Sequence, residues 1–235
     1  MSDLRPRPPE HSKTLNARTF ISNMKKSDKK YTISLSDYTK KGFLLLKDNE
    51  ITYIVCKISN NKTYIANTCK NAASQQFQDY FLNQISILIS FQHPTVIHFY
   101  GFSLNDFENK PNITFLTSHY KYVLSNFLSN RSVKADFQDF QSTDRQILLI
   151  GIARGMHLFH ERCIIHKRLN SDNIYINKKF HPKIFGFGSS KPEINFYSAP
   201  ETILKGIYSV KTDVYSFGIL MYEILSAFKA YSKEK

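Results

Sequence analysis

Glycine, tryptophan and cysteine are scarce in this chain of 235 residues, which has 8 glycines, 3 cysteines and no tryptophan. Glycine stands at about half its usual share of roughly 7%, so a collagen-like chain is excluded. The cysteines Cys56, Cys69 and Cys163 show no C-x-x-C spacing and have no histidine at ligand spacing. A disulfide scaffold and a structural zinc site are therefore excluded. Scattered single cysteines are typical of a reducing compartment, and we expect a cytoplasmic protein.

Long apolar runs are also missing. The longest, Ile147 to Ala153, is far shorter than the roughly 20 residues that a membrane-spanning helix needs. The first residues, Met1 to His11, lack the apolar core of a signal peptide. We therefore expect no membrane insertion.

Acidic residues are few relative to basic ones, with 19 Asp and Glu against 32 Lys and Arg and a formal net charge of +13. Residues 1–36 are polar, contain Pro6, Pro8 and Pro9, and show no helical or strand period, which predicts a basic, disordered N-terminal tail. Such a charge permits attraction to nucleic acid. No run of five or more basic residues occurs, so nucleic acid is not the expected partner and stays an alternative.

From about Asp37 the pattern is that of a folded domain. The β-branched runs Ile51–Ile58 and Thr63–Ala66 flank a turn at Asn60–Asn61 and predict a hairpin, and Phe43–Leu46 predicts a strand before it. Apolar residues at three- and four-residue steps predict a helix from Phe77 to Ile89, which His93-Pro94 ends.

The second half is predicted to be mainly helical, after short strands at residues 96–102 and 113–117. Thr143 and Gln146 form a capping-box pattern before a helix over Gln146–Glu161, and a second helix covers Asp213–Leu225. Both helices are apolar on most faces, which is typical of buried helices. Strands followed by helices predict an α+β fold in two lobes.

Five short motifs then occur in a fixed order. They are FQHPTVIHFYGFS (91–103), His166-Lys167-Arg168-Leu169 with Asn173 four residues later, KIFGFG (183–188), SAPE (198–201) and KTDVYSFGILMYEIL (211–225). Together they resemble the signature motifs of the protein kinase superfamily, of the tyrosine-kinase-like type.

The resemblance implies a protein-kinase-like domain over 37–235, with a small lobe at 37–117, a hinge at 118–122 and a large lobe at 123–235. A large lobe of this family would continue for several helices after Leu225, so we expect it to be truncated at its C-terminus. Either the chain is a fragment or a partner covers the exposed face.

The groups that transfer phosphate in this family are replaced. Alignment puts Leu46, Asp48 and Ile51 at the three positions of the glycine-rich loop, where side chains would obstruct the phosphates. Arg168 stands at the general base, and a guanidinium cannot accept a proton. Gly186 stands at the metal-binding aspartate, which leaves Asn173 as the only remaining ligand position.

The nucleotide-binding residues are degenerate as well. Ala66-Asn67-Thr68 is matched to the A-x-K triplet, which puts Thr68 at the lysine, with Lys70 as a possible substitute two residues on. Gln84 takes the place of the helix glutamate, which cannot form an ion pair. Tyr53, Tyr175 and Ala66 align with adenine-contacting positions, and Thr117 with the gatekeeper. We expect no cofactor to bind; a minority hypothesis has Arg168 and Lys70 support metal-free nucleotide binding.

The framework, by contrast, is kept. His166, Phe187, Leu88 and Phe99 align with the family's regulatory column of apolar side chains, and Asp213 with the residue that holds the catalytic loop. The sequence therefore resembles a pseudokinase that scaffolds or allosterically regulates a protein partner in signalling, with an active kinase as a candidate. Two alternatives stay open: a weak protein kinase that uses ATP and Mg to phosphorylate Ser/Thr or Tyr, and a nucleic-acid binder that uses the basic tail.

Overall fold

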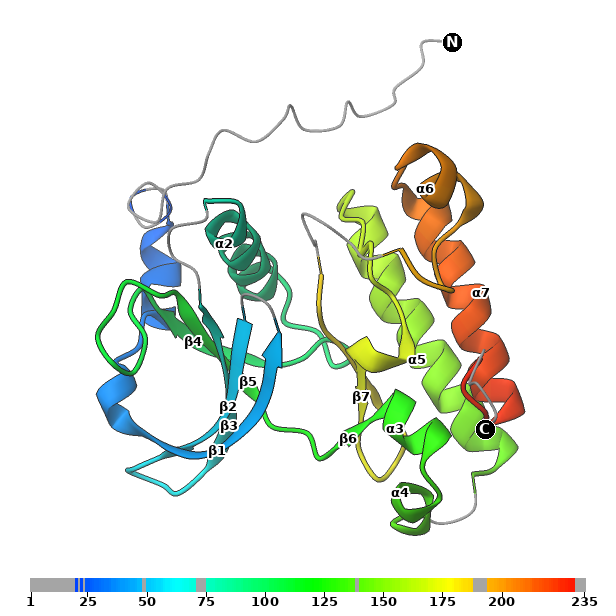
Figure 1. Ribbon diagram of the computed structural model, residues 1–235, viewed down its shortest axis with the longest axis horizontal. Helices are drawn as coiled ribbons and strands as arrows, with labels where there is room; N and C mark the ends of the chain where they lie inside the picture. The colour runs from blue at the N-terminus through cyan, green and yellow to red at the C-terminus, as the bar shows by residue number, and fades with distance from the viewer. Residues whose placement is uncertain are drawn as a thin grey trace.

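The small lobe is an antiparallel β-sheet with one helix packed on it. In this computed structural model, residues 20, 22, 24–47, 50–70, 75–137, 140–187 and 194–230 are described. The strands are β1 (Tyr38–Lys47), β2 (Glu50–Lys57), β3 (Thr63–Cys69), β4 (Phe99–Ser103) and β5 (Thr114–Ser118). They lie in the order β1-β2-β3-β5-β4, and α2 (Gln75–Ser90) lies beside the sheet (Figure 1).

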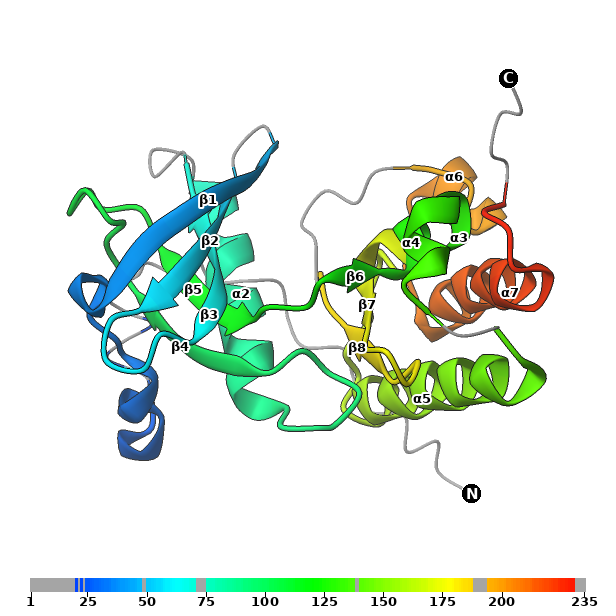
Figure 2. The ribbon, with the colours of Figure 1, turned by 90° about the horizontal axis from the view of Figure 1, so that it is seen from below.

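The large lobe contains the longer helices, α5 (Ser142–Glu161) and α7 (Val210–Ser226), which lie side by side (Figure 1). Shorter helices are α3 (Leu124–Ser129), α4 (Arg131–Ala135) and α6 (Pro200–Lys205). A small sheet of β6 (Tyr122–Val123), β7 (Ile174–Ile176) and β8 (Pro182–Ile184) lies against α5, as Figure 2 shows. The expected two-lobed α+β fold is confirmed. Among the described residues, no helix combines the length and apolarity of a membrane span.

The expected elements are present, with one difference at the start of α5. The helix is capped by Gln141, whose backbone N–H donates to the Asp144 carboxylate at 2.9 Å. The capping box therefore lies two residues before the Thr143–Gln146 pair that the sequence suggested. Asp144 in the first turn also stabilises the helix through the helix dipole, which glutamine cannot do.

Part of the segment expected to be a disordered tail is folded onto the small lobe. A 3₁₀ helix covers Lys26–Tyr31, and the Tyr31 ring lies 5.4 Å from that of Phe99. Ile33 donates its N–H to the carbonyl of Phe102 at 2.9 Å, and Leu35 is buried. Isolated apolar residues among lysines carry no period, so the sequence pattern missed a segment that is held by sheet contacts. Residues 1–19 lie outside the described part of the chain.

One hydrophobic core joins the lobes. Residues Leu88 of α2, Phe99 of β4, Phe159 of α5 and Phe187 belong to a single buried cluster. The Phe187 ring lies 4.5 Å from Phe159 and 5.0 Å from His166. The apolar column that the sequence suggested is therefore packed, and it fixes the position of the loop that follows His166.

Candidate functional site

The two faces of β3 have different surroundings. Cys69 on β3 and Phe115 on β5 share a core with α2, where the Phe81 ring lies 5.5 Å from that of Phe115. Ala66 belongs instead to a separate cluster on the other face of the sheet. Because side chains alternate along a strand, Ile65, Asn67 and Cys69 lie on the face of the sheet that packs on α2, whereas Ala66 and Thr68 lie on the other face.

This placement corrects several sequence expectations. The Thr68 hydroxyl bonds to that of Thr114 at 3.0 Å, and Tyr53, paired with Ala66, contacts Phe107 with ring centroids 6.1 Å apart. Lys70 borders a hollow on this outer face together with Thr68. Ala66, Thr68, Lys70 and Tyr53 are therefore not cleft residues, and Lys70 cannot replace the missing lysine. A register error of one residue exchanges the two faces of a strand.

Asn67 on β3 and Gln84 on α2, which take the positions of the family's ion pair, are both uncharged. Asn67 is 2% exposed and accepts a hydrogen bond from the Thr52 hydroxyl at 3.2 Å. Gln84 on α2 is 1% exposed, as the sequence alignment required of a residue facing the sheet. Among the described residues, the Asn67 Nδ2, the Gln84 Oε1 and the Thr117 hydroxyl have no hydrogen-bond partner. Where kinases place an ion pair, this chain thus has two buried amides.

The connection between β1 and β2 is two residues long. The strands stay paired to Lys47 and Glu50, so only residues 48 and 49 lie between them. Asp48 is outside the described residues. Leu46 is half exposed on the edge strand, and Ile51 pairs with Thr68 on the far face of the sheet. Neither of the two residues between Lys47 and Glu50 is a glycine.

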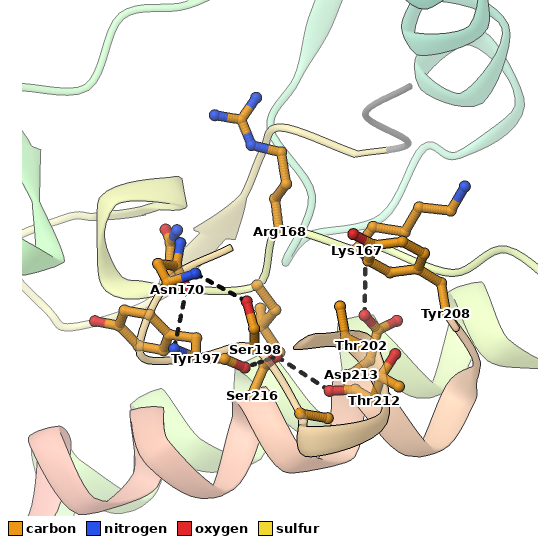
Figure 3. Close-up of a pocket in the computed structure, with 13 residues that line it drawn as sticks. Lys167, Arg168, Asn170, Tyr197, Ser198, Thr202, Tyr208, Thr212, Asp213 and Ser216 are labelled. Atoms are coloured by element: carbon orange, nitrogen blue, oxygen red, sulfur yellow. Dashed lines mark hydrogen bonds between the residues drawn. The ribbon is translucent and has the colours of Figure 1, made fainter. Parts of the chain in front are cut away.

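Asp213 at the start of α7 holds the loop of residues 166–173. Its carboxylate accepts the backbone N–H group of His166 at 2.8 Å. It also accepts that of Lys167 at 3.0 Å, as Figure 3 shows. The His160 ring also contacts it, with Nε2 at 2.9 Å. Asp213 is 2% exposed, so a buried negative charge is compensated by three donors.

His166 has a structural role here. Its Nδ1 accepts the N–H of Arg168 at 3.2 Å, so its Nε2 carries the proton and donates to the Phe185 carbonyl at 3.1 Å. Burial lowers the pKa of His166 to about 4, with the Asp213 charge opposing this shift. The imidazole is therefore neutral at physiological pH and links the loop to the segment before Gly186.

Arg168 extends away from the pocket formed by the loop, as Figure 3 shows. Its guanidinium lies near the hydroxyl of Tyr80 on α2, close enough for its charge to affect the pKa of that group. Burial raises the pKa of Tyr80, and the Arg168 charge partly offsets that rise. The position that would accept a substrate proton thus holds a permanent cation that connects the loop to α2.

Gly186 and Asn173 lie against each other. Gly186 has φ +81°, and a Cβ built there would lie 2.9 Å from the Asn173 Oδ1. The Asn173 Nδ2 donates to the Arg168 carbonyl at 2.7 Å. The amide therefore stabilises the loop, and the left-handed backbone favours the glycine found there.

The residues present do not fit Mg²⁺ with ATP. Among the described residues, no three His, Cys, Asp or Glu side chains gather at metal-binding distance. Asp172, the nearest acid in the loop, is exposed and pairs with Lys229 at 3.3 Å. Mg²⁺ prefers carboxylate oxygens in this setting, and the site offers one amide beside a guanidinium.

Aromatic side chains line the floor of the cleft. The Tyr175 ring lies 6.2 Å from Phe185 and 6.2 Å from Tyr120. Burial raises the pKa of Tyr175 to about 12, so the phenol stays protonated. Tyr175 is thus buried between the rings of Tyr120 and Phe185.

A smaller pocket lies between the loop and α7 (Figure 3). Tyr197 is one of its lining residues, and its hydroxyl lies 2.8 Å from both oxygens of Glu223 and 2.9 Å from the Ser171 hydroxyl, which are outside the pocket lining. Burial raises the pKa of both Tyr197 and Glu223. This network, together with Asn67 and Tyr80, was missed by the sequence reasoning. Only the position of Glu223 within an apolar helix gave a signal of a buried, partnered acid.

The small lobe is a five-stranded sheet with one helix, and the large lobe is helical and contains a loop held by a buried aspartate. These features define a two-lobed phosphotransferase-like fold. Sequence comparison agrees: the model of the protein tyrosine and serine/threonine kinase family matches residues 51–234. The chain belongs to the protein kinase family.

Individual relatives are similar over about two thirds of the chain. Cysteine-rich receptor-like protein kinase 41 of Arabidopsis thaliana is 31% identical over 177 residues, 66% of this chain and 25% of the relative. A probable serine/threonine-protein kinase of Dictyostelium discoideum is 32% identical over 176 residues, 70% of this chain and 13% of the relative. The chain thus spans a quarter or less of these two relatives.

Proposed function

We propose that this chain is a catalytically inactive kinase-like domain that acts by binding a protein partner in signalling, in the cytoplasm. The observation that carries the proposal is the chemistry of the interlobe cleft. Arg168, Gly186 and the neutral pair Asn67 and Gln84 replace the base, the metal ligand and the ion pair. Loss of the base alone costs about 10²–10⁴ in rate. The packed apolar column around Phe187 and the loop of residues 166–173 held by Asp213 support a fold that serves binding. An active kinase is a candidate partner.

A thermal-shift titration of the 235-residue chain with ATP, with and without Mg²⁺, tests this proposal. We expect no change in melting temperature in either series. The test is sensitive, because a nucleotide that bound at 100 times its Kd would stabilise the fold by about 2.7 kcal/mol. A shift that needs Mg²⁺ would contradict the proposal.

A phosphorylation assay separates residual activity from contamination. Any transfer of labelled phosphate to the chain or to a general Ser/Thr or Tyr substrate is expected to be the same for Asn173→Ala. Transfer that disappears in Asn173→Ala, with the melting temperature of that variant taken into account, would restore the enzyme hypothesis.

A further inference from the structure

A groove on the large lobe lies away from the interlobe cleft and has no assigned role. It is formed by the first half of α5, by the turn between β7 and β8, and by residues 93–95 before β4. Its volume is about 610 Å³. Figure 2 shows β8 and the turn before it lying against α5.

Two glycines in α5 create this arrangement. A Cβ at Gly151 would lie 2.5 Å from Pro182, and one at Gly155 would lie 2.5 Å from Ile184. β8 therefore rests directly on the helix backbone. Ile147 and Ile150 lie one turn earlier on the same helix face. They line the groove instead of being covered by β8, and Ile150 is 52% exposed.

The wall of the groove is basic and apolar. Arg154 carries a permanent charge and Lys183 an ammonium group whose pKa is lowered by burial, and His93 and His181 also line the groove. No acidic side chain is among the described residues that line it. None of the ion pairs of the described residues involves Arg154. The Lys183 ammonium donates to the Pro94 carbonyl, which fixes its position without neutralising it.

From this geometry we propose that the groove is a docking site for an acidic segment of another protein, with an apolar side chain flanked by aspartate or glutamate. The apolar side chain covers Ile147 and Ile150, and the carboxylates meet Arg154 and Lys183. This inference names the partner chemistry of the binding role proposed above and rests on that role.

The other occupants fit less well. Residues 1–19 carry four basic and two acidic side chains, so this part of the chain does not complement a basic groove. A second copy carries a net charge of +13 and so brings no excess of acidic side chains to meet this wall. A nucleic acid needs cations along its phosphates, whereas this wall has one arginine and one lysine around an exposed isoleucine.

Fluorescence anisotropy with two labelled peptide pools tests the inference on the full chain. One pool carries leucine or phenylalanine flanked by aspartate and glutamate, and the matched pool has lysine in place of each acid. We expect the acidic pool alone to bind, with affinity that falls as salt is raised. Arg154→Glu should weaken it by about tenfold or more, because a charge pair becomes a repulsion, and Ile150→Ser should weaken it without a change in charge.

Lys205→Glu at the end of α6 is the control, since it makes the same change in net charge on an exposed residue away from the groove. Its binding should match that of the unchanged chain. Equal loss in Lys205→Glu and Arg154→Glu, or no binding of the acidic pool, would overturn the inference. Binding of a labelled single-stranded DNA that depends on Arg154 would overturn it in favour of nucleic acid. None of these outcomes bears on the nucleotide titration, so the two proposals can fail separately.

Discussion

Arg168 differs from an aspartate by two units of charge, and its contact with Tyr80 gives it a position in the fold. Together with Gly186 it removes both acids from the phosphate side of the cleft. The sequence alone identified these two losses, because the loop motif is contiguous and its length is unchanged. The contact between Arg168 and α2 could not be predicted, since it joins residues 88 positions apart through a side chain whose direction no pattern records.

Restoring the two acids is not expected to restore catalysis. The variant Arg168→Asp with Gly186→Asp still has Asn67 where a lysine would hold phosphate. A side chain at φ +81° with Asn173 at 2.9 Å also costs about 1–2 kcal/mol. We expect no Mg²⁺-dependent phosphorylation and a lower melting temperature. Activity in this variant would show that the cleft keeps a productive shape.

His166 makes stability depend on pH. Its pKa is lowered to about 4 in the folded state, against 6.5 ordinarily, so only the unfolded chain takes up this proton between these values. Stability is therefore lost as pH falls from about 6.5 to about 4, by about 3 kcal/mol from this group. Urea unfolding across this range should show the loss, and His166→Gln should flatten the profile.

The matched control for this measurement is His157→Gln. His157 is exposed and pairs with Glu161 at 3.2 Å. Its profile should follow that of the unchanged chain, and an equally flat profile in His157→Gln would show that the effect is not specific to the buried ring.

At the scale of elements, the sequence predicted which segments form strands and helices, but not which face of β3 meets α2. The run from Thr63 to Cys69 is apolar or small on both faces, so its alternation is weak. A shift of one residue in the alignment therefore decides whether Thr68 or Asn67 takes the position of the lysine. The distinction needed the contacts of Phe115 and Phe81, which come from β5 and α2. Gln84 lies on α2 and is buried, and there a helical period and the following His93-Pro94 fix the register of the sequence.

The neutral pair between β3 and α2 can be tested with a double-mutant cycle. Asn67→Lys alone buries a cation without a counter-charge and should destabilise the chain, and Gln84→Glu alone should do the same with an anion. The double variant should recover about 1–3 kcal/mol relative to the sum of the single effects. Additive losses in chemical denaturation would mean that the two side chains do not meet.

The contact between α7 and the loop is expected to carry a large share of stability. Asp213→Ala leaves two backbone N–H groups and a ring nitrogen without their buried partner, which should cost about 3–5 kcal/mol. The control is Asp172→Ala in the same loop, where an exposed ion pair is worth less than about 1 kcal/mol. Similar losses in both variants would contradict this assignment.

At the scale of the whole molecule, the outer face of α6 and α7 exposes large apolar side chains. They are Leu204, Val214, Tyr222, Leu225 and Phe228. Large exposed apolar side chains on neighbouring elements favour association. We expect the 235-residue chain to self-associate with rising concentration in sedimentation velocity, and Tyr222→Lys with Leu225→Lys to reduce this. A monomer at all concentrations would contradict the expectation.

The carboxylate of Asp213 has a further consequence for how the molecule opens. The amides of His166 and Lys167 lie outside any helix or strand, yet both donate to a buried acceptor on α7. Backbone amide protons in loops are ordinarily among the fastest in a protein to exchange with deuterium. These two protons can exchange only when α7 separates from the loop, so their exchange rate reports the opening of the large lobe itself.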